Sequence, residues 1–257
     1  MKMFNLLFLF AFLLVLGSCK DVQEENGKVV DESQLPEDHG DLNTYAKRHV
    51  EGQLRIAAYE KYELKIYKEN LDEDDKVDAI ITVNRLNFAI EEAANSANPA
   101  KRAEIGYMGN FNFFFYYDGA KDLISPPIVV ASSPLLPLKV SFENISSNNY
   151  KDILIDFRIR NSSFKDFFTI INGIPRRVFE FRNFDGIGTT KSECYAFQYT
   201  AGSYSASKDI QVVKANFSSI PKDADLNIFE PVIKPTNELL YTFFYVPQEG
   251  KYMTKKR

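Results

Sequence analysis

A 20-residue segment of this chain occurs twice, and this recurrence restricts the fold more than any other feature. The segments LKIYKENLDEDDKVDAIITV (64–83) and LKVSFENISSNNYKDILIDF (138–157) share six identical positions, and most other apolar positions match in kind. In both, apolar stretches of β type flank a polar loop. This pattern predicts two antiparallel strands joined by that loop. A weaker third copy, with a shortened loop, is expected at 213–229.

A second element follows each copy: an aromatic run that leads into an acid–glycine turn. These runs end at Gly119, Gly186 and Gly250, and Asn172-Gly173 predicts a further tight hairpin turn. The chain has 22 Phe and 14 Tyr but no Trp, which favours β-structure. Only Asn87–Ala97 has a helical pattern. We expect a mainly β, repeat-built fold with one short helix, either an open propeller-like stack or a pseudo-repetitive β-sandwich.

The amino terminus has the pattern of a secretory signal. Lys2 precedes the apolar run Phe4–Leu16, which is shorter than the roughly 20 residues that a membrane span needs. The sequence LGSC, ending at Cys19, resembles the lipobox of bacterial lipoproteins. That resemblance implies removal of residues 1–18 and a lipid on Cys19. The alternative is an ordinary secretory signal that happens to contain a cysteine.

The segment after Cys19 is strongly acidic. Residues 20–41 hold eight acids and two lysines, which predicts a disordered tether over 19–41. Its first acids resemble the export signal of Bacteroidota surface lipoproteins, which implies a lipid-anchored protein of the outer membrane, exposed at the cell surface. Residues 42–257 are expected to form one β-rich domain with about three degenerate repeats. This domain is nearly neutral, so we expect no nucleic-acid partner.

The first polar loop carries oxygen donors at alternate positions. Counting from Asn70, the odd positions hold Asn70, Asp72, Asp74, Lys76 and Asp78. Calcium prefers about six to eight oxygens from carboxylates, amides, backbone carbonyls and water. A curled loop could supply one amide, three carboxylates and the Lys76 carbonyl. The alternative is a solvated acidic hairpin.

This loop resembles the calcium-binding hairpin loops of integrin-type FG-GAP repeats and of the related bacterial VCBS-type repeats. The resemblance implies one calcium ion, held by the five residues named above. Two positions depart from the family pattern: Asn70 stands where an aspartate is usual, and Asp75 stands where a glycine is usual. The second copy retains one carboxylate at the corresponding positions, so we expect a loop that keeps its shape without a metal. Those positions are Asn144, Ser146, Asn148 and Asp152.

Recognisable catalytic motifs are missing from the sequence. No Gly-x-Ser-x-Gly, His-Glu-x-x-His or nucleotide-binding pattern occurs, and His39 and His49 lie in or near the acidic segment. Cys194, in an aromatic strand-like context, is expected to be a buried, inert thiol. We therefore expect a lipid-anchored envelope protein whose calcium-stabilised β-repeat domain serves adhesion, assembly or binding of a protein or glycan. The alternative is an envelope hydrolase that uses carboxylates on the β-scaffold.

Overall fold

The computed structural model describes residues 39–254, which belong to one compact unit. This part of the chain is mainly β, with three helices and two antiparallel sheets, and neither sheet closes on itself. The mainly β expectation is confirmed. The expected signal peptide, the lipidated Cys19 and the tether up to Asp38 lie outside the described residues.

The smaller sheet has five strands and contains the first predicted hairpin. Its strands run in the order β1-β2-β3-β4, and β5 also pairs with β3. All residues of β2 are buried, because both faces of this sheet are covered. The strands are β1 (Glu63–Glu69), β2 (Asp78–Asn84), β3 (Asn112–Asp118), β4 (Leu123–Ile124) and β5 (Ile128–Val129).

The larger sheet has eight strands, and each strand pairs with its neighbour in sequence, from β6 to β13. Short connections therefore suffice between most of the strands. The strands are β6 (Lys139–Glu143), β7 (Asp152–Ile159), β8 (Ser162–Ile171), β9 (Ile174–Asp185), β10 (Glu193–Thr200), β11 (Asp209–Phe217), β12 (Ile233–Val246) and β13 (Lys251–Met253).

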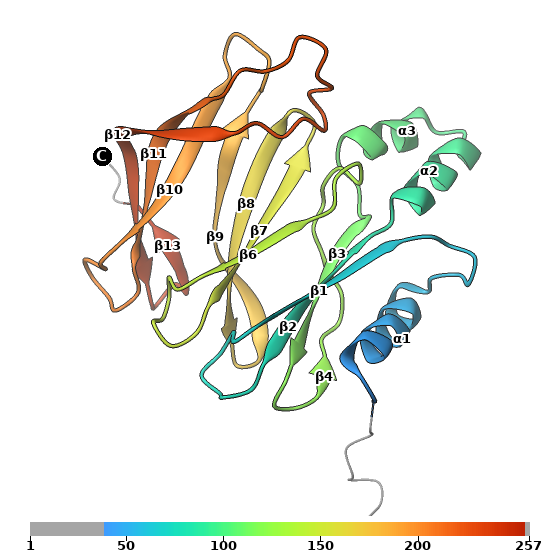
Figure 1. Cartoon of the computed structure of the whole chain (residues 1–257), viewed down its shortest axis with the longest axis horizontal. Helices are drawn as coiled ribbons and strands as arrows, with labels where there is room; N and C mark the ends of the chain where they lie inside the picture. Colours follow the sequence, from blue (N-terminus) through green and yellow to red (C-terminus); the bar gives the residue numbers. More distant parts are fainter. Residues whose placement is uncertain (1–38, 255–257) are drawn as a thin grey trace, which may run out of the picture. The chain divides into compact units, whose positions relative to one another are not determined.

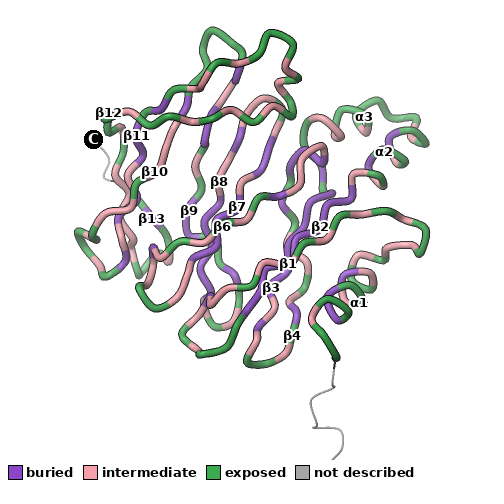
Figure 2. Tube along the Cα trace, in the orientation of Figure 1, coloured by how far each residue is buried: buried purple, intermediate pink, exposed green. Residues whose placement is uncertain are grey.

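The main core lies between the two sheets. Ile80 and Phe114 of the small sheet pack in one cluster with Ile153, Ile155 and Phe168 of the large sheet. Figure 2 shows the corresponding buried stretches in β2, β3 and the β7–β9 region. Burial of this apolar area is the dominant favourable term in holding the sheets together.

The outer face of the small sheet is covered by helix α1 (Leu42–Leu54), as Figure 1 shows. Ala46 and Val50 of the helix pack against Ile81 and Phe115. A further aromatic cluster forms on the large sheet, where Phe167 of β8 lies with Tyr252 of β13 in one core. Strands β8 and β13, which are not neighbours in the large sheet, thus share a core.

The expectation of a single helix is wrong. The predicted segment corresponds to α2 (Leu86–Asn95), but α1 and α3 (Pro99–Gly106) are also present. Asp41 caps α1 by accepting hydrogen bonds from the amides of the next turn, and Asn98 caps α3 in the same way. The Asn98-Pro99 pair, which signals the end of one helix, also begins another, since proline suits the first helical turn. None of the described helices is long and apolar enough to cross a membrane.

Both copies of the long segment form hairpins, as predicted. Glu69 pairs with Asp78 at the end of the first hairpin, and Glu143 pairs with Asp152 at the end of the second. The β8–β9 turn at Asn172-Gly173 is also confirmed, with positive φ at both residues. The predicted third hairpin is wrong: 213–217 completes β11, and 218–232 contains no strand.

Candidate functional site

Three hairpin loops of eight residues share one structural device. They cover 70–77, 144–151 and 201–208, and the strand after each loop begins with a buried aspartate. These aspartates are Asp78, Asp152 and Asp209, with exposed fractions of 0%, 2% and 2%. Each carboxylate accepts hydrogen bonds from main-chain amides near the start of its own loop. Each aspartate, which follows its loop, therefore bonds the start of that loop and holds its two ends together.

The second and third loops use the same contacts. The Asp152 Oδ2 atom accepts the amide of Ser146 at 2.6 Å, and Oδ1 accepts the Ser146 hydroxyl at 2.5 Å. The Asp209 Oδ2 atom accepts both the amide of Ser203 at 3.0 Å and its hydroxyl at 2.5 Å. Charge-assisted hydrogen bonds of this kind are stronger than those between neutral groups, so each loop is held in one conformation.

The three loops lie side by side in a row. The Lys151 amide donates to the carbonyl oxygen of Asn70 at 2.9 Å, which joins the second loop to the first. The Lys208 amide donates to the carbonyl oxygen of Ile145 at 2.7 Å, which joins the third loop to the second. Lys151 and Lys208 both immediately precede a capping aspartate. We call 70–77, 144–151 and 201–208 together the loop row.

The acidic side chains of the first loop hold its own backbone. The Asp72 Oδ1 atom accepts the amide of Asp74 at 3.0 Å, and the Asp74 Oδ1 atom accepts the amide of Lys76 at 2.7 Å. The Tyr116 hydroxyl of β3 donates to Asp72 Oδ2 at 3.3 Å. The loop is therefore formed by local turns in which each aspartate bonds the amide two residues later.

Asp78 differs from Asp72 and Asp74 because it is buried and accepts hydrogen bonds from two separate segments of the chain. Its Oδ2 atom accepts the amide of Leu71 at 3.1 Å, and its Oδ1 atom accepts the amide of Gly119, after β3, at 3.0 Å. Burial raises the pKa of Asp78, these hydrogen bonds oppose the rise, and the charges of Asp72 and Asp74 add to it. Asp72 and Asp74 thus place two like charges close to Asp78.

The residues of the first loop match calcium in donor type. The Asn70 Oδ1 atom is buried and has no hydrogen-bond partner among residues 39–254, as expected of a ligand oxygen whose partner is a cation. The carboxylates do not converge: within residues 39–254, no three His, Cys, Asp or Glu side chains are grouped so that they could hold a metal ion. The oxygen donors are of the types that calcium binds. In this structure the carboxylates bond main-chain amides instead.

The second loop is closed by one carboxylate and by the neutral side chains of Asn144 and Ser146. The Asn144 side-chain amide donates to the carbonyl oxygens of Tyr150 at 2.7 Å and Asn148 at 3.4 Å. Ser146 is bound by Asp152, as described above. These contacts close the turn without a cation.

An open cavity of about 650 Å³ lies beside the first loop. Asp72 and Asp74 form one side, and Tyr150, the Asn172-Gly173 turn and Tyr245 of β12 form others. Both tyrosines are partly exposed. A site with acidic oxygens on one side and aromatic rings on the other suits a polar ligand or a partner loop.

The expected candidates for nucleophilic catalysis are not assembled. Cys194 is buried in an apolar cluster with Phe184 and Ala215, and burial raises the pKa of its thiol to about 11. The His49 ring bonds the carbonyl oxygen of Ser125, and burial lowers its pKa. A thiol that stays protonated at neutral pH is a poor nucleophile, and the expected burial of Cys194 is confirmed.

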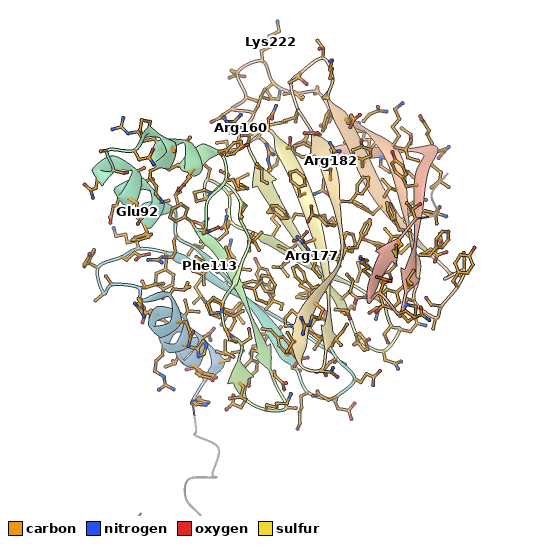
Figure 3. All side chains as sticks on the ribbon, turned by 180° about the vertical axis from the view of Figure 1, so that it is seen from behind. Glu92, Phe113, Arg160, Arg177, Arg182 and Lys222 are labelled. Atoms are coloured by element: carbon orange, nitrogen blue, oxygen red, sulfur yellow. The ribbon has the colours of Figure 1, made fainter. Side chains whose placement is uncertain are left out.

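One carboxylate pair lies beside a cavity. Asp166 of β8 and Glu180 of β9 are cross-strand neighbours that line a cavity of about 300 Å³. Burial raises the pKa of Asp166 to about 6. Arg177, labelled in Figure 3, bonds Asp166 at 3.3 Å and Glu180 at 2.6 Å. The cation bridges the two acids.

Sequence reasoning missed three residues of the loop row and its support. Asp209 had one available signal, because Lys-Asp-Ile occurs both at 151–153 and at 208–210. Tyr116 had none, and Gly119 was predicted only as part of an acid–glycine turn, since the contacts of both with the first loop cross more than 40 positions of the chain. Comparisons with protein-family models, curated proteins and solved structures find no match for this chain. The function of this chain is therefore inferred from the chemistry of the described residues.

Proposed function

We propose that this chain is a lipid-anchored protein of the bacterial outer membrane whose loop row binds a protein or glycan at the cell surface. The observation that carries this proposal is the row itself: three internally hydrogen-bonded loops joined edge to edge, of which the first and second line an open cavity. Rigid loops lose little conformational entropy on binding. Such an arrangement suits adhesion or assembly.

The first loop of the row is proposed to bind one calcium ion. Asn70, Asp72, Asp74 and Asp78 would supply side-chain oxygens, and Lys76 would supply its carbonyl. The supporting observations are the unpartnered oxygen of Asn70 and the like charges around Asp78. A divalent cation would offset this repulsion and fix the acidic wall of the cavity.

The hairpins of the loop row are proposed to be degenerate copies of one unit. Their shared length, their capping aspartates and their equivalent lysine contacts support this relation. On this proposal the domain is a pseudo-repetitive β-sandwich rather than a propeller, because its two sheets share a core. The second and third loops would have kept the capping aspartate and lost the remaining acids.

The calcium proposal is tested by thermal unfolding of the full chain with calcium and then with a chelator. A ligand at 100 times its dissociation constant adds about 2.7 kcal/mol of apparent stability. Asp74→Asn should abolish the calcium-induced shift, whereas Glu73→Gln, which removes one charge from the same loop, should retain it. An equal loss in both variants would reduce the effect to general electrostatics, and no shift at millimolar calcium would exclude the site.

The anchor is tested separately by membrane fractionation. Cys19→Ser should release the protein from the membrane fraction and prevent the mass increase that a lipid gives. An unchanged distribution would exclude lipidation at Cys19. This outcome is independent of calcium binding, so the two parts of the proposal can fail separately.

The alternative function is an envelope hydrolase, which the Asp166–Glu180 pair favours. A carboxyl group with a pKa near 6 has the property of a general acid. An assay with chromogenic esters and glycosides should then reveal an activity that Asp166→Asn abolishes while the protein remains folded. Equal rates in the variant and the wild type would exclude this pair as catalytic.

A further inference from the structure

A second cavity lies on the large sheet, away from the loop row. It has a volume of about 280 Å³ and lies between strands β6–β9 and the segment that carries Glu230. Polar side chains on one face of the sheet form its floor. Lys139, Asp156 and Lys165 are consecutive cross-strand neighbours on β6, β7 and β8, and the next pair on the same face of β7 and β8 is Arg158 and Ser163.

Most charges in this cavity are paired. Lys165 bonds Asp156 at 2.8 Å, and Lys139 bonds Glu230 of the covering segment. Arg158 differs, because it forms no ion pair within the described residues. Three cations and two carboxylates therefore line the cavity, which gives the lining one excess positive charge, and the charges of Glu230 and Asp225 act on Arg158 from the covering segment.

The Arg158 guanidinium is buried. The Arg158 residue is only 6% exposed, and its guanidinium donates to the carbonyl oxygens of Phe229, Leu226 and Arg160 at 2.9, 2.6 and 3.2 Å. It also lies over the Phe184 ring, 4.8 Å from the ring centre, and its Nε atom has no hydrogen-bond partner in the described part of the chain. Burial lowers its pKa to about 10. Carbonyl dipoles and an aromatic ring offset part of the cost of burying a cation, and a nearby anion would offset more.

We propose that this cavity binds a small molecule that carries a carboxylate together with hydroxyl or ammonium groups. The carboxylate would bond Lys139, Lys165 and the Ser163 hydroxyl, in the field of the Arg158 guanidinium. Asp156 and Glu230 would accept from the hydroxyl or ammonium groups. The single excess positive charge matches a monoanion, and the two acids in the lining repel a dianion such as phosphate.

The cavity is independent of the proposed calcium loop. Asp152, which follows the second loop where Lys151 bonds the first loop, begins β7, and Arg158 lies six residues further along the same strand. At about 3.3 Å per residue, this separation is roughly 20 Å. Binding in the cavity and binding of calcium can therefore be measured separately.

The proposal is tested by calorimetric titration of the full chain with acetate, L-glutamate and D-glucuronate. L-Glutamine and D-glucose serve as uncharged counterparts, and inorganic phosphate serves as the dianion. At least one carboxylate should bind at millimolar concentration, and its uncharged counterpart should not. Lys139→Gln should weaken that binding about tenfold, the effect of removing one charge-assisted hydrogen bond.

A matched control is available on the same sheet. Lys214 forms an ion pair with Glu238 and is about as exposed as Lys139, so Lys214→Gln removes an equivalent charge elsewhere. It should leave the affinity unchanged. The proposal is overturned if no carboxylate binds, if phosphate binds more tightly than any carboxylate, or if both lysine variants lose affinity equally.

Discussion

The Oδ2 oxygen of Asp152 accepts a hydrogen bond from the main-chain amide of Ser146 at 2.6 Å, across the second loop of the row. The same carboxylate also accepts the Ile145 amide and the Ser146 hydroxyl. Asp152→Ala would leave these donors without a partner in a buried site. We predict a loss of about 2–4 kcal/mol in the free energy of unfolding, measured with urea.

Two variants control this prediction. Asp152→Asn keeps one acceptor oxygen and should be less destabilising than the alanine variant. Asp223→Ala removes an exposed aspartate and should change stability by less than about 0.5 kcal/mol. If Asp152→Ala were as mild as Asp223→Ala, the capping role would be wrong.

Arg85 and Glu60 form a buried ion pair between the start of α2 and the segment before β1. Both contacts, Nε to Oε1 and Nη2 to Oε2, are 2.6 Å long, and the two side chains are only 10% and 5% exposed. The guanidinium also lies 4.0 Å from the Phe88 ring centre. Glu60→Ala would leave an uncompensated buried cation, so we predict a loss of about 3–5 kcal/mol in chemical denaturation.

Most of this loss of stability should come from the unpaired Arg85 charge in a buried site, and less from the loss of the ion pair itself. The double variant Glu60→Leu with Arg85→Met replaces both partners with apolar groups and should recover much of the lost stability. A double variant less stable than Glu60→Ala would contradict this explanation.

Asp166 should make stability depend on pH in an unusual direction. Burial raises its pKa from the ordinary 3.8 to about 6, so the folded protein keeps this proton after the unfolded chain has lost it. The stabilising contribution is present below pH of about 4 and is lost as pH rises through about 6. Asp166→Asn stays neutral, so its stability relative to wild type should improve between about pH 4 and 7 by on the order of 3 kcal/mol.

Urea unfolding of both proteins across this pH range measures the difference directly. Asp223→Asn is the control, because it makes the same substitution at an exposed position. Its difference from the wild type should stay constant. A constant difference for Asp166→Asn as well would mean that Asp166 is ionised in the folded protein throughout.

The features that could be predicted from the sequence depend on interactions between residues that are close together in the chain. The hairpins at 64–83 and 138–157 depend on local apolar patterns, and the Asn172-Gly173 turn depends on two adjacent residues, so all were predicted. Arg158 carries no such signal, since alternating polar residues are normal in a strand with one solvated face. Its burial results from the segment around Phe229, 71 positions away. The cavity could not be predicted for the same reason, because its lining residues are far apart in the sequence.

Gly119 and Gly52 should respond to alanine in opposite directions. A Cβ atom on Gly119 would lie 2.2 Å from the Val77 carbonyl oxygen, which is backbone, and the residue cannot move without disturbing the amide that Asp78 accepts. Gly52 lies in α1 with no atom within 4 Å of such a Cβ. Gly119→Ala should therefore cost about 1–3 kcal/mol through overpacking. Gly52→Ala should gain about 0.5–1 kcal/mol, because alanine favours the helix. Thermal unfolding of the two variants measures both signs, and a neutral Gly119→Ala would refute the close contact between β3 and the first loop.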